Sequence, residues 1–219
     1  MPLQDVKSTP TAAAAKRIIF RNFFNCGQTC VAPNYILCHK SIKDKLIQNL
    51  KAEIVKQYGK DPLSNNDYGK IINQKHFDRL LNLIDPSKIY FGGKSDLQKL
   101  KIEPTIVDNV SWNDKIMEEE IFGPILPILT FDNIQQIITI LQHKPKSLAL
   151  YVFSENKKNI KQITNNLSYG GGCINDTIIH LATCNMGFGG VGESGMGSYH
   201  GKEGFNAFSH NKSIVDKKT

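Results

Sequence analysis

The sequence lacks any long apolar run, and this absence argues against a membrane-spanning helix. None of its apolar stretches approaches the roughly 20 residues that a helix needs to cross a bilayer. The first eleven residues, MPLQDVKSTPT, contain no apolar core segment, so we predict no signal peptide. We therefore expect a cytoplasmic protein without a transmembrane anchor.

Paired cysteines are also missing. The five cysteines are Cys26, Cys30, Cys38, Cys173 and Cys184, and no two of them form a C-x-x-C pair. The odd number and the absence of a secretion signal argue against a disulfide framework. The lack of C-x-x-C argues against a structural zinc site. We predict that the protein holds no metal.

Clustered positive charge is absent too, although the formal net charge is +7. Lysines are spread along the whole chain, whereas a nucleic-acid-binding face gathers basic residues on one side with aromatic residues among them. The terminal DKKT is too short to act as a polybasic arm. We predict a lysine-rich solvated surface and no nucleic-acid partner.

What is present is an alternation of candidate strands and helices, in a chain of 219 residues that is long enough for one sizeable core. Apolar runs predict strands at 35–38, 88–91, 104–110, 125–131 and 148–153, and a short strand around Ile174. Helical spacing predicts helices at 12–24, between Ser41 and Gly59, and at 74–83, 133–142 and 156–167, with Ser41 and Asp132 as N-terminal caps. This order is typical of an α/β sheet covered on both faces. Residues from Met186 on are glycine-rich and predicted to be mostly irregular.

The segment NCGQTCVAP at residues 25–33 places a cysteine at the end of a glycine-containing turn. Backbone N–H groups in such a turn can stabilise a thiolate, which is the form that attacks a carbonyl carbon. Taken alone the pattern is weak, since a cysteine in an apolar stretch is usually an inert core residue. The segment resembles the nucleophile segment of aldehyde dehydrogenases, in which a G-Q-x-C run carries the catalytic cysteine. The resemblance makes Cys30 the nucleophile and Cys26 a structural residue.

A second segment, EEEIFGP at residues 118–124, would otherwise be an acidic, solvated turn before a strand. It resembles the E-E-I-F-G-P run of the same family. The resemblance implies that Glu120 binds the nicotinamide ribose and that Phe122 packs beside the nicotinamide, with NAD or NADP as the cofactor. A carboxylate suits a ribose because it accepts hydrogen bonds from two adjacent hydroxyls at once.

The glycine-rich segment at 188–202, FGGVGESGMGSYHGK, matches the dinucleotide fingerprint by letter at Gly190, Gly192 and Gly195. We reject that interpretation, because the fingerprint needs a hydrophobic strand before it and a helix after it, and neither is predicted. The segment is similar instead to the F-G-G-x-G-x-S-G-x-G loop near the end of aldehyde dehydrogenases. With the S-Y-H-G-K and F-S-H that follow, it is most similar to the class 3 subfamily, which handles medium- and long-chain aliphatic aldehydes and aromatic ones.

The motifs run in the family's order from about residue 12 to about residue 212. The resemblance therefore implies a three-layer α/β/α catalytic domain at 12–212. A disordered start at 1–11, which resembles nothing in the family, would precede it, and a tail at 213–219 would follow. The fold would be incomplete, since the family's main cofactor-binding domain is missing.

The resemblance implies NAD(P)-dependent oxidation of aldehydes to carboxylic acids. The Cys30 thiolate would add to the aldehyde, hydride transfer would leave a thioester, and a glutamate would activate the water that releases the acid. In the family that glutamate lies in an E-L-G-G-K run upstream of the nucleophile, and no such run occurs here. The asparagine that helps to bind the oxyanion also lies further upstream.

Two interpretations of function stay open. In the first, the chain is a portion of a longer aldehyde dehydrogenase, and we expect a homodimer. In the second, the short chain is non-catalytic and acts only by association with a full-length subunit. The presence of Cys30, Glu120 and Phe122 favours the first, and the missing general base favours the second for this chain alone.

Overall fold

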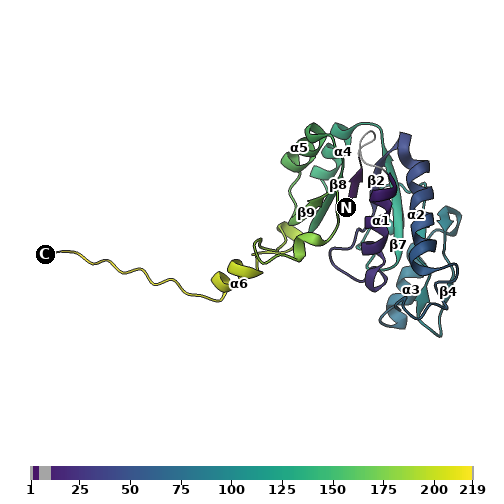
Figure 1. Ribbon diagram of the computed structural model, residues 1–219, viewed down its shortest axis with the longest axis horizontal. Coiled ribbons are helices and arrows are strands. Elements are labelled where there is room, and N and C mark those ends of the chain that lie inside the picture. Colours follow the sequence, from purple (N-terminus) through teal and green to yellow (C-terminus); the bar gives the residue numbers. More distant parts are fainter. Residues whose placement is uncertain (1, 5–10, 219) are drawn as a thin grey trace.

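The computed structural model describes residues 2–4 and 11–218, and a seven-stranded sheet forms its centre (Figure 1). Across the sheet the strands are β3 (Ile89–Phe91), β6 (Thr105–Val107), β7 (Ile125–Phe131), β2 (Ile36–His39), β1 (Pro2–Gln4), β8 (Ala149–Phe153) and β9 (Gly171–Ile174). Neighbouring strands are parallel, except that β3 runs antiparallel to β6. A separate small hairpin joins β4 (Ser95–Asp96) to β5 (Lys101–Ile102).

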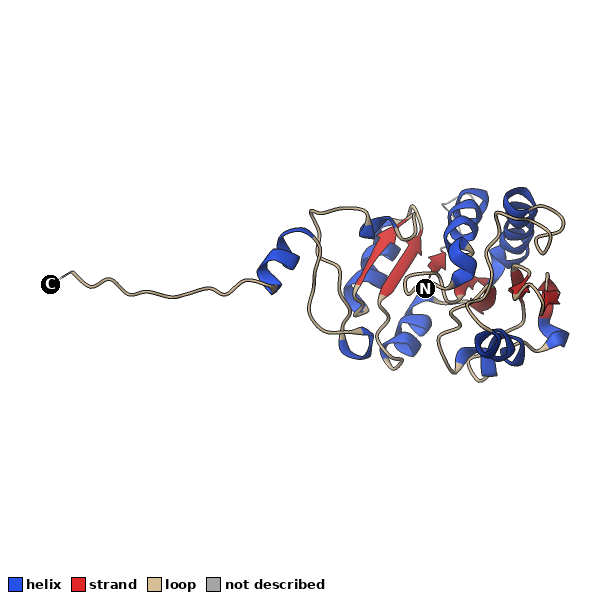
Figure 2. Cartoon of the chain, turned by 90° about the horizontal axis from the view of Figure 1, so that it is seen from below, coloured by secondary structure: helices blue, strands red, loops and turns tan. Residues whose placement is uncertain are grey.

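Helices cover both faces of this sheet (Figure 2). Successive side chains of a strand point to opposite faces, so on β2 Ile36 and Cys38 enter one hydrophobic cluster while Leu37 enters the other. The first cluster also contains residues of α1 (Thr11–Asn22) and α2 (Lys43–Tyr58); the second contains residues of α3 (Gln74–Leu83), α4 (Ile134–Gln142) and α5 (Lys157–Asn166). The predicted three-layer α/β/α arrangement is confirmed.

Helix α3 and strand β7 have the predicted bounds. The α3 helix begins where the Asn73 side chain accepts a hydrogen bond from the His76 N–H at 2.9 Å. Its buried residues Phe77, Leu80 and Leu83 recur at helical spacing, so one stripe faces the sheet. Strand β7 is buried along almost its whole length, as a central parallel strand should be.

Both predicted helix caps are wrong. Ser41 does not cap α2, because it lies in a short 3₁₀ turn where its backbone N–H donates to Nδ1 of His39 at 3.2 Å. Asp132 does not cap α4 either; it pairs with Lys40, while the Asn133 side chain accepts from an N–H of the first turn. The carbonyl of Asp132 bonds to Nε2 of His39 at 3.1 Å. Ser41 and Asp132 therefore make contacts around the ends of β2 and β7, and neither side chain caps the helix that follows it.

The prediction of a disordered start is wrong for Pro2–Gln4, which forms β1 between β2 and β8. A segment without periodicity becomes a strand here because the strands on its two sides offer free backbone donors and acceptors. The rest of the predicted disordered start, apart from Thr11, lies outside the described residues. Helix α1 begins at Thr11, one residue earlier than predicted, and ends at Asn22 instead of Phe24.

The glycine-rich end is less irregular than predicted. It contains a short helix, α6 (Gly201–Ala207), after which residues 208–218 run away from the body of the sheet (Figure 1). No residue of α6 is buried, so the helix has no apolar stripe from which its period could be predicted. The apolar Phe205 is 74% exposed and Phe208 is 96% exposed.

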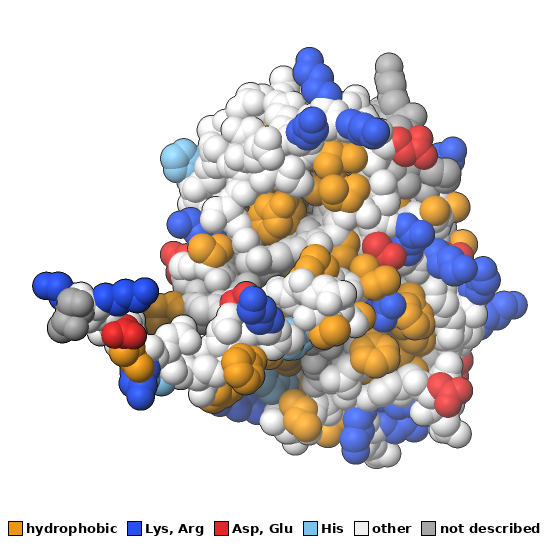
Figure 3. Space-filling view, turned by 60° about the vertical axis from the view of Figure 1, so that its left-hand side comes forward, with side chains coloured by type: hydrophobic (Ala, Val, Ile, Leu, Met, Phe, Trp, Pro, Cys, Tyr) orange, Lys and Arg blue, Asp and Glu red, His pale blue; other side chains and the backbone are white. Residues whose placement is uncertain are grey.

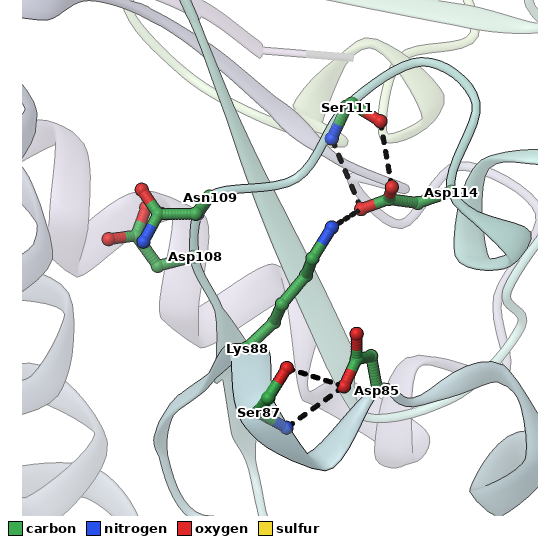
Figure 4. Close-up of polar contacts among 7 residues, drawn as sticks. All are labelled: Asp85, Ser87, Lys88, Asp108, Asn109, Ser111 and Asp114. Carbon is green, nitrogen blue, oxygen red and sulfur yellow. Dashed lines mark hydrogen bonds and ion pairs between the residues drawn. The ribbon is translucent and has the colours of Figure 1, made fainter.

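A polar cluster fixes the loop that follows β6 (Figure 4). The Lys88 ammonium pairs with the Asp114 carboxylate, which also accepts hydrogen bonds from the Ser111 N–H at 3.2 Å and the Ser111 hydroxyl at 2.7 Å. The bond from Lys88 is the largest cause that lowers the pKa of Asp114. Because this loop leads directly to residues 118–124, the cluster braces the second predicted site segment.

The lowered pKa of Asp114 predicts how stability depends on pH. A carboxyl whose pKa is lower in the folded than in the unfolded state contributes stability above the unfolded value, about 3.9, and loses it as the pH falls through the folded value. We expect Asp114→Asn to destabilise the protein near neutral pH and to weaken the fall in unfolding free energy on acidification. Urea unfolding at several pH values tests this. An unchanged pH dependence would show that the pair does not contribute.

Candidate active site

Cys30 lies in an exposed turn after α1 and a short 3₁₀ segment, Phe24–Gly27. The Ala32 N–H closes this turn on the Thr29 carbonyl at 2.9 Å. Among the described residues, no hydrogen bond engages the backbone N–H of Cys30. The turn therefore presents both a thiol and a free backbone donor, which are the two groups that acyl chemistry requires at a nucleophile.

Gln28, two residues before the thiol, fastens the turn to residues 70–72. Its side-chain amide donates to the carbonyls of Asn25 at 3.1 Å and Lys70 at 3.0 Å. Its side-chain oxygen accepts from the Ile72 N–H at 3.0 Å. In the sequence this glutamine is only one letter of the G-Q-x-C motif, but its contacts show that it holds the turn in place.

We expect Gln28→Ala to lower the unfolding free energy by about 1.5–4.5 kcal/mol, since three side-chain hydrogen bonds are lost and each contributes about 0.5–1.5 kcal/mol. Gln48→Ala is the matched control. That glutamine, on the exposed face of α2, donates one hydrogen bond to the Tyr90 hydroxyl at 2.6 Å, and its loss should cost well under half as much. Urea unfolding measures both. Equal losses would contradict the structural role of Gln28.

The two predicted site segments touch through their backbones. Gly27 has a left-handed φ of 71°, and a Cβ added to it would stand 2.2 Å from the carbonyl oxygen of Gly123. Only glycine permits so close an approach together with that φ. The Asn34 side chain adds a second tie by accepting from the Ile121 N–H at 2.8 Å. Residues 118–124 are thereby held against the nucleophile turn.

Arg79, on α3, clamps the segment that carries Glu120. Its guanidinium pairs with Glu119 at 3.0 Å and donates to the carbonyl of Glu120 at 3.4 Å and to that of Ile121. No sequence pattern marks this residue, because the contacts join positions about 40 residues apart. Desolvation raises the pKa of the Glu120 carboxyl, and the charge of Arg79 opposes the rise.

Phe122 follows with a left-handed φ of 49°, and the residue is 37% exposed. A left-handed φ is uncommon for an aromatic residue, and such strain is concentrated at functional sites. Together with Glu120, Gly27 and Thr29, it lines a narrow crevice between the two segments. The structure thus brings Glu120 and Phe122 next to the turn that carries Cys30.

A cavity of about 510 Å³ opens beside the thiol. Its walls combine acidic, basic and aromatic side chains with a few smaller polar or apolar ones. The lining residues are Cys30, Asn34, Tyr35, Trp112, Met117, Glu118, Glu119, Glu120, Lys144, Pro145, Lys146, Ser147, Leu148, Glu193 and Ser194. Glu193 and Ser194 come from the glycine-rich segment, to which the sequence analysis assigned no site residue. The cavity is large enough for part of a dinucleotide or for a small aldehyde.

The glycine-rich segment is a folded loop and not a dinucleotide fingerprint. Phe188 and Tyr199 form an isolated antiparallel bridge, and a single 3₁₀ turn, Gly192–Ser194, lies between them. The Ser194 hydroxyl accepts from the Val191 N–H at 2.9 Å and donates to its carbonyl at 3.0 Å. Among the described residues here, neither a strand leading in nor a helix directly after the glycines is present, so the structure supports the rejection.

The five cysteines differ sharply in solvent exposure. Cys26 is 1% exposed, and burial raises the pKa of its thiol to about 11. Cys38 is fully buried, and burial raises the pKa of its thiol to about 12. Desolvation also raises the pKa of Cys173. Cys30 and Cys184 are exposed, and Cys30 alone of these two lines the cavity with Glu120.

Within the described ranges 2–4 and 11–218, no group of three or more metal-ligating side chains comes together. The same part of the chain contains no helix with the length and apolar character needed to cross a bilayer.

The family of the chain follows from comparison with known proteins. Residues 6–214 match the aldehyde dehydrogenase family. The chain belongs to the aldehyde dehydrogenase family. The match begins at residue 6 and so includes part of the segment that we expected to lie outside the family.

Individual relatives agree. The chain is 50% identical over 208 residues to 4,4'-diaponeurosporen-aldehyde dehydrogenase of Staphylococcus aureus. It is 46% identical over 204 residues to aldehyde dehydrogenase family 3 member A2 of Rattus norvegicus, and 46% identical over 202 residues to the dimeric NADP-preferring aldehyde dehydrogenase of Mus musculus. These alignments cover 92–94% of this chain. The resemblance to class 3 enzymes is confirmed.

A solved structure of Staphylococcus aureus AldH in a substrate-bound state superposes with a TM-score of 0.96 at 47% identity, over 100% of this chain and 48% of that one. The chain spans about half the length of these three curated relatives, with 42–45% of each covered. The aldehyde dehydrogenase fold of the part present is therefore established.

Proposed function

We propose that this chain supplies the nucleophile and part of the cofactor site for NAD(P)-dependent oxidation of aldehydes to carboxylic acids, as part of a longer enzyme. One observation carries the proposal: the exposed Cys30 thiol and the Glu120 carboxylate line the same cavity. The general base and the remaining cofactor contacts would come from residues that these 219 do not include.

Cys30 is the group that attacks. Its thiolate forms a C–S bond to the aldehyde carbon, and the carbonyl π electrons move onto oxygen, which becomes an oxyanion. The unengaged N–H of Cys30 is a donor for that oxyanion. After oxidation the acyl group stays on the sulfur as a thioester, and hydrolysis releases the acid and restores the thiol.

Glu120 and Phe122 fit a dinucleotide cofactor. Among the described residues no hydrogen bond engages the Glu120 carboxylate, so both oxygens remain free to accept from two ribose hydroxyls. The exposed ring of Phe122 offers a flat apolar surface of the kind that packs beside an aromatic ring. NAD or NADP, when bound, supplies the hydride acceptor. One relative carries the name NADP-preferring.

The substrates proposed are medium- and long-chain aliphatic or aromatic aldehydes, after the class 3 relatives. The proposed location is the cytoplasm.

We also propose that the chain associates, either with a second copy or with a full-length aldehyde dehydrogenase subunit. Several large apolar side chains are exposed on the C-terminal segment, including Phe205, Phe208 and Val215 at 74%, 96% and 92%, and hydrophobic groups lie open on the face in Figure 3. Exposed apolar surface promotes association, and one relative is named as dimeric. Light scattering tests it; a stable monomer with no affinity for such a subunit would contradict it.

The catalytic proposal is tested by acylation with an activated ester, which needs neither cofactor nor general base. With 4-nitrophenyl acetate we expect a burst of nitrophenol and an acetyl group on the peptide that contains Cys30. Cys30→Ser should abolish the burst, whereas Cys184→Ser, which removes the other exposed thiol, should leave it intact. A burst that survives in Cys30→Ser would overturn the assignment.

A further inference from the structure

The peptide that follows Cys30 is bonded to the central sheet. Tyr151 of β8 is fully buried, at 0% exposure, and its hydroxyl donates to the carbonyl of Val31 at 2.7 Å. The two residues are 120 positions apart in the sequence. Tyr151 belongs to the same hydrophobic cluster as residues of α1 and α2. Its side chain therefore points to the face of the sheet that these two helices cover, and the nucleophile turn follows α1.

That peptide is fixed at both ends. The N–H of Ala32 shares a peptide unit with the carbonyl of Val31, and it closes the turn on Thr29 at 2.9 Å. One bond therefore shapes the turn, while the bond from Tyr151 sets where the turn stands relative to the sheet. A rigid strand is a better support for a reacting group than a loop is.

Tyr151 also packs against residues of β9 and of the loop that follows β9. Cys173 of β9 and Ile178 of the loop after it pack against the same hydrophobic cluster as Tyr151. Ile178 has a left-handed φ of 63°, which is strained for a β-branched residue and persists only where the surroundings impose it. The ring of His180 lies edge-on to Tyr151, with centroids 5.9 Å apart. Tyr151 thus contacts both the nucleophile turn, through Val31, and the loop after β9, through His180.

We infer that Tyr151 is a positioning residue, which places the Cys30 thiol and backbone N–H in the cavity by bonding the Val31 carbonyl and by packing against His180 in the loop after β9. The inference rests on the proposed role of Cys30 as the nucleophile. Tyr151 touches neither substrate nor cofactor; its effect passes through the backbone of the turn.

Tyr151→Phe keeps the ring and removes only the hydroxyl. We expect the rate constant of Cys30 acylation by 4-nitrophenyl acetate to fall about ten- to hundredfold, because a displacement of about 1 Å at a reacting group has effects of this size. The fall should be similar at every pH, since the change acts on position. The matched control is Tyr68→Phe, in which an equally buried tyrosine loses a 2.7 Å bond to the Ile102 carbonyl. It should lower stability similarly and leave the acylation rate within about twofold.

Hydrogen exchange on the unaltered chain provides a second measurement, which does not depend on the variant folding. If Tyr151 holds the turn to β8, the Ala32 amide should exchange only when β8 opens, with protection close to that of the β8 amides. Exchange of Ala32 about a thousandfold faster than in β8 would overturn the inference.

The outcomes separate the two ideas. Failure of the unaltered chain to acylate at Cys30 counts against the proposed function, and exchange at Ala32 then decides the role of Tyr151 alone. Acylation of the unaltered chain at Cys30 with equal rates in Tyr151→Phe and Tyr68→Phe overturns the positioning role and leaves the proposed function standing.

Discussion

The 219-residue chain alone is expected to form no measurable NADH or NADPH from hexanal or benzaldehyde. Loss of a general base costs about 10²–10⁴-fold, and the sequence contains no E-L-G-G-K run to supply the family's glutamate. A cofactor held by Glu120 and Phe122 alone would also be poorly oriented, and orientation accounts for a large part of rate enhancement. Absorbance of the reduced cofactor, followed over hours at high protein concentration, makes the measurement.

A full-length class 3 relative is the positive control for this experiment, and the Cys30→Ser chain is the negative one. The unaltered chain should match the negative control in NAD(P)H formation while still acylating with an activated ester. Rapid NADH formation by the unaltered chain, lost in Cys30→Ser, would show that the residues present are sufficient for catalysis.

Gly27→Ala is expected to produce the largest loss of stability among single substitutions near the site. The left-handed φ of 71° costs about 1–2 kcal/mol in an alanine. The added Cβ would also lie 2.2 Å from the backbone oxygen of Gly123, so the two site segments must separate, at an additional cost of about 1–3 kcal/mol. We expect a total loss of about 2–5 kcal/mol, with loss of Cys30 acylation.

Gly197→Ala is the control for strain without collision. Its φ is also left-handed, at 77°, but an added Cβ would meet nothing within 4 Å. We expect a loss of about 1–2 kcal/mol from the backbone alone. Urea unfolding and ester acylation on both variants separate the two causes. If Gly27→Ala cost no more than Gly197→Ala, the close contact between the site segments would not be supported.

Elements whose signal is local were predictable from the sequence. Helix α3 carries its own buried stripe, and β7 is a continuous apolar run, so period and composition defined their bounds. The strand β1 and helix α6 were missed for opposite reasons. Pro2–Gln4 becomes a strand only between two neighbours that are distant in sequence, and α6 buries nothing.

The site divides in the same way. Cys30, Glu120 and Phe122 stand in motifs that resemble a known family, so their positions could be named from the sequence alone. Arg79 donates to two backbone carbonyls 41 and 42 residues away, and Tyr151 donates to one that is 120 residues away. No periodicity or spacing encodes such a contact, because it exists only after the strands have paired. The residues proposed to carry the chemistry are therefore visible in the sequence, and those that support them are not.

The central claim is that Cys30 is the nucleophile, and competitive alkylation of the native chain tests it most directly. Substoichiometric iodoacetamide at neutral pH, followed by quenching, digestion and mass spectrometry, ranks the five thiols by rate. We predict that Cys30 reacts first and ahead of Cys184, which is also exposed, and that the buried Cys26 and Cys38 react only on unfolding. Preferential labelling of Cys26 or Cys184 in the folded chain would contradict the assignment.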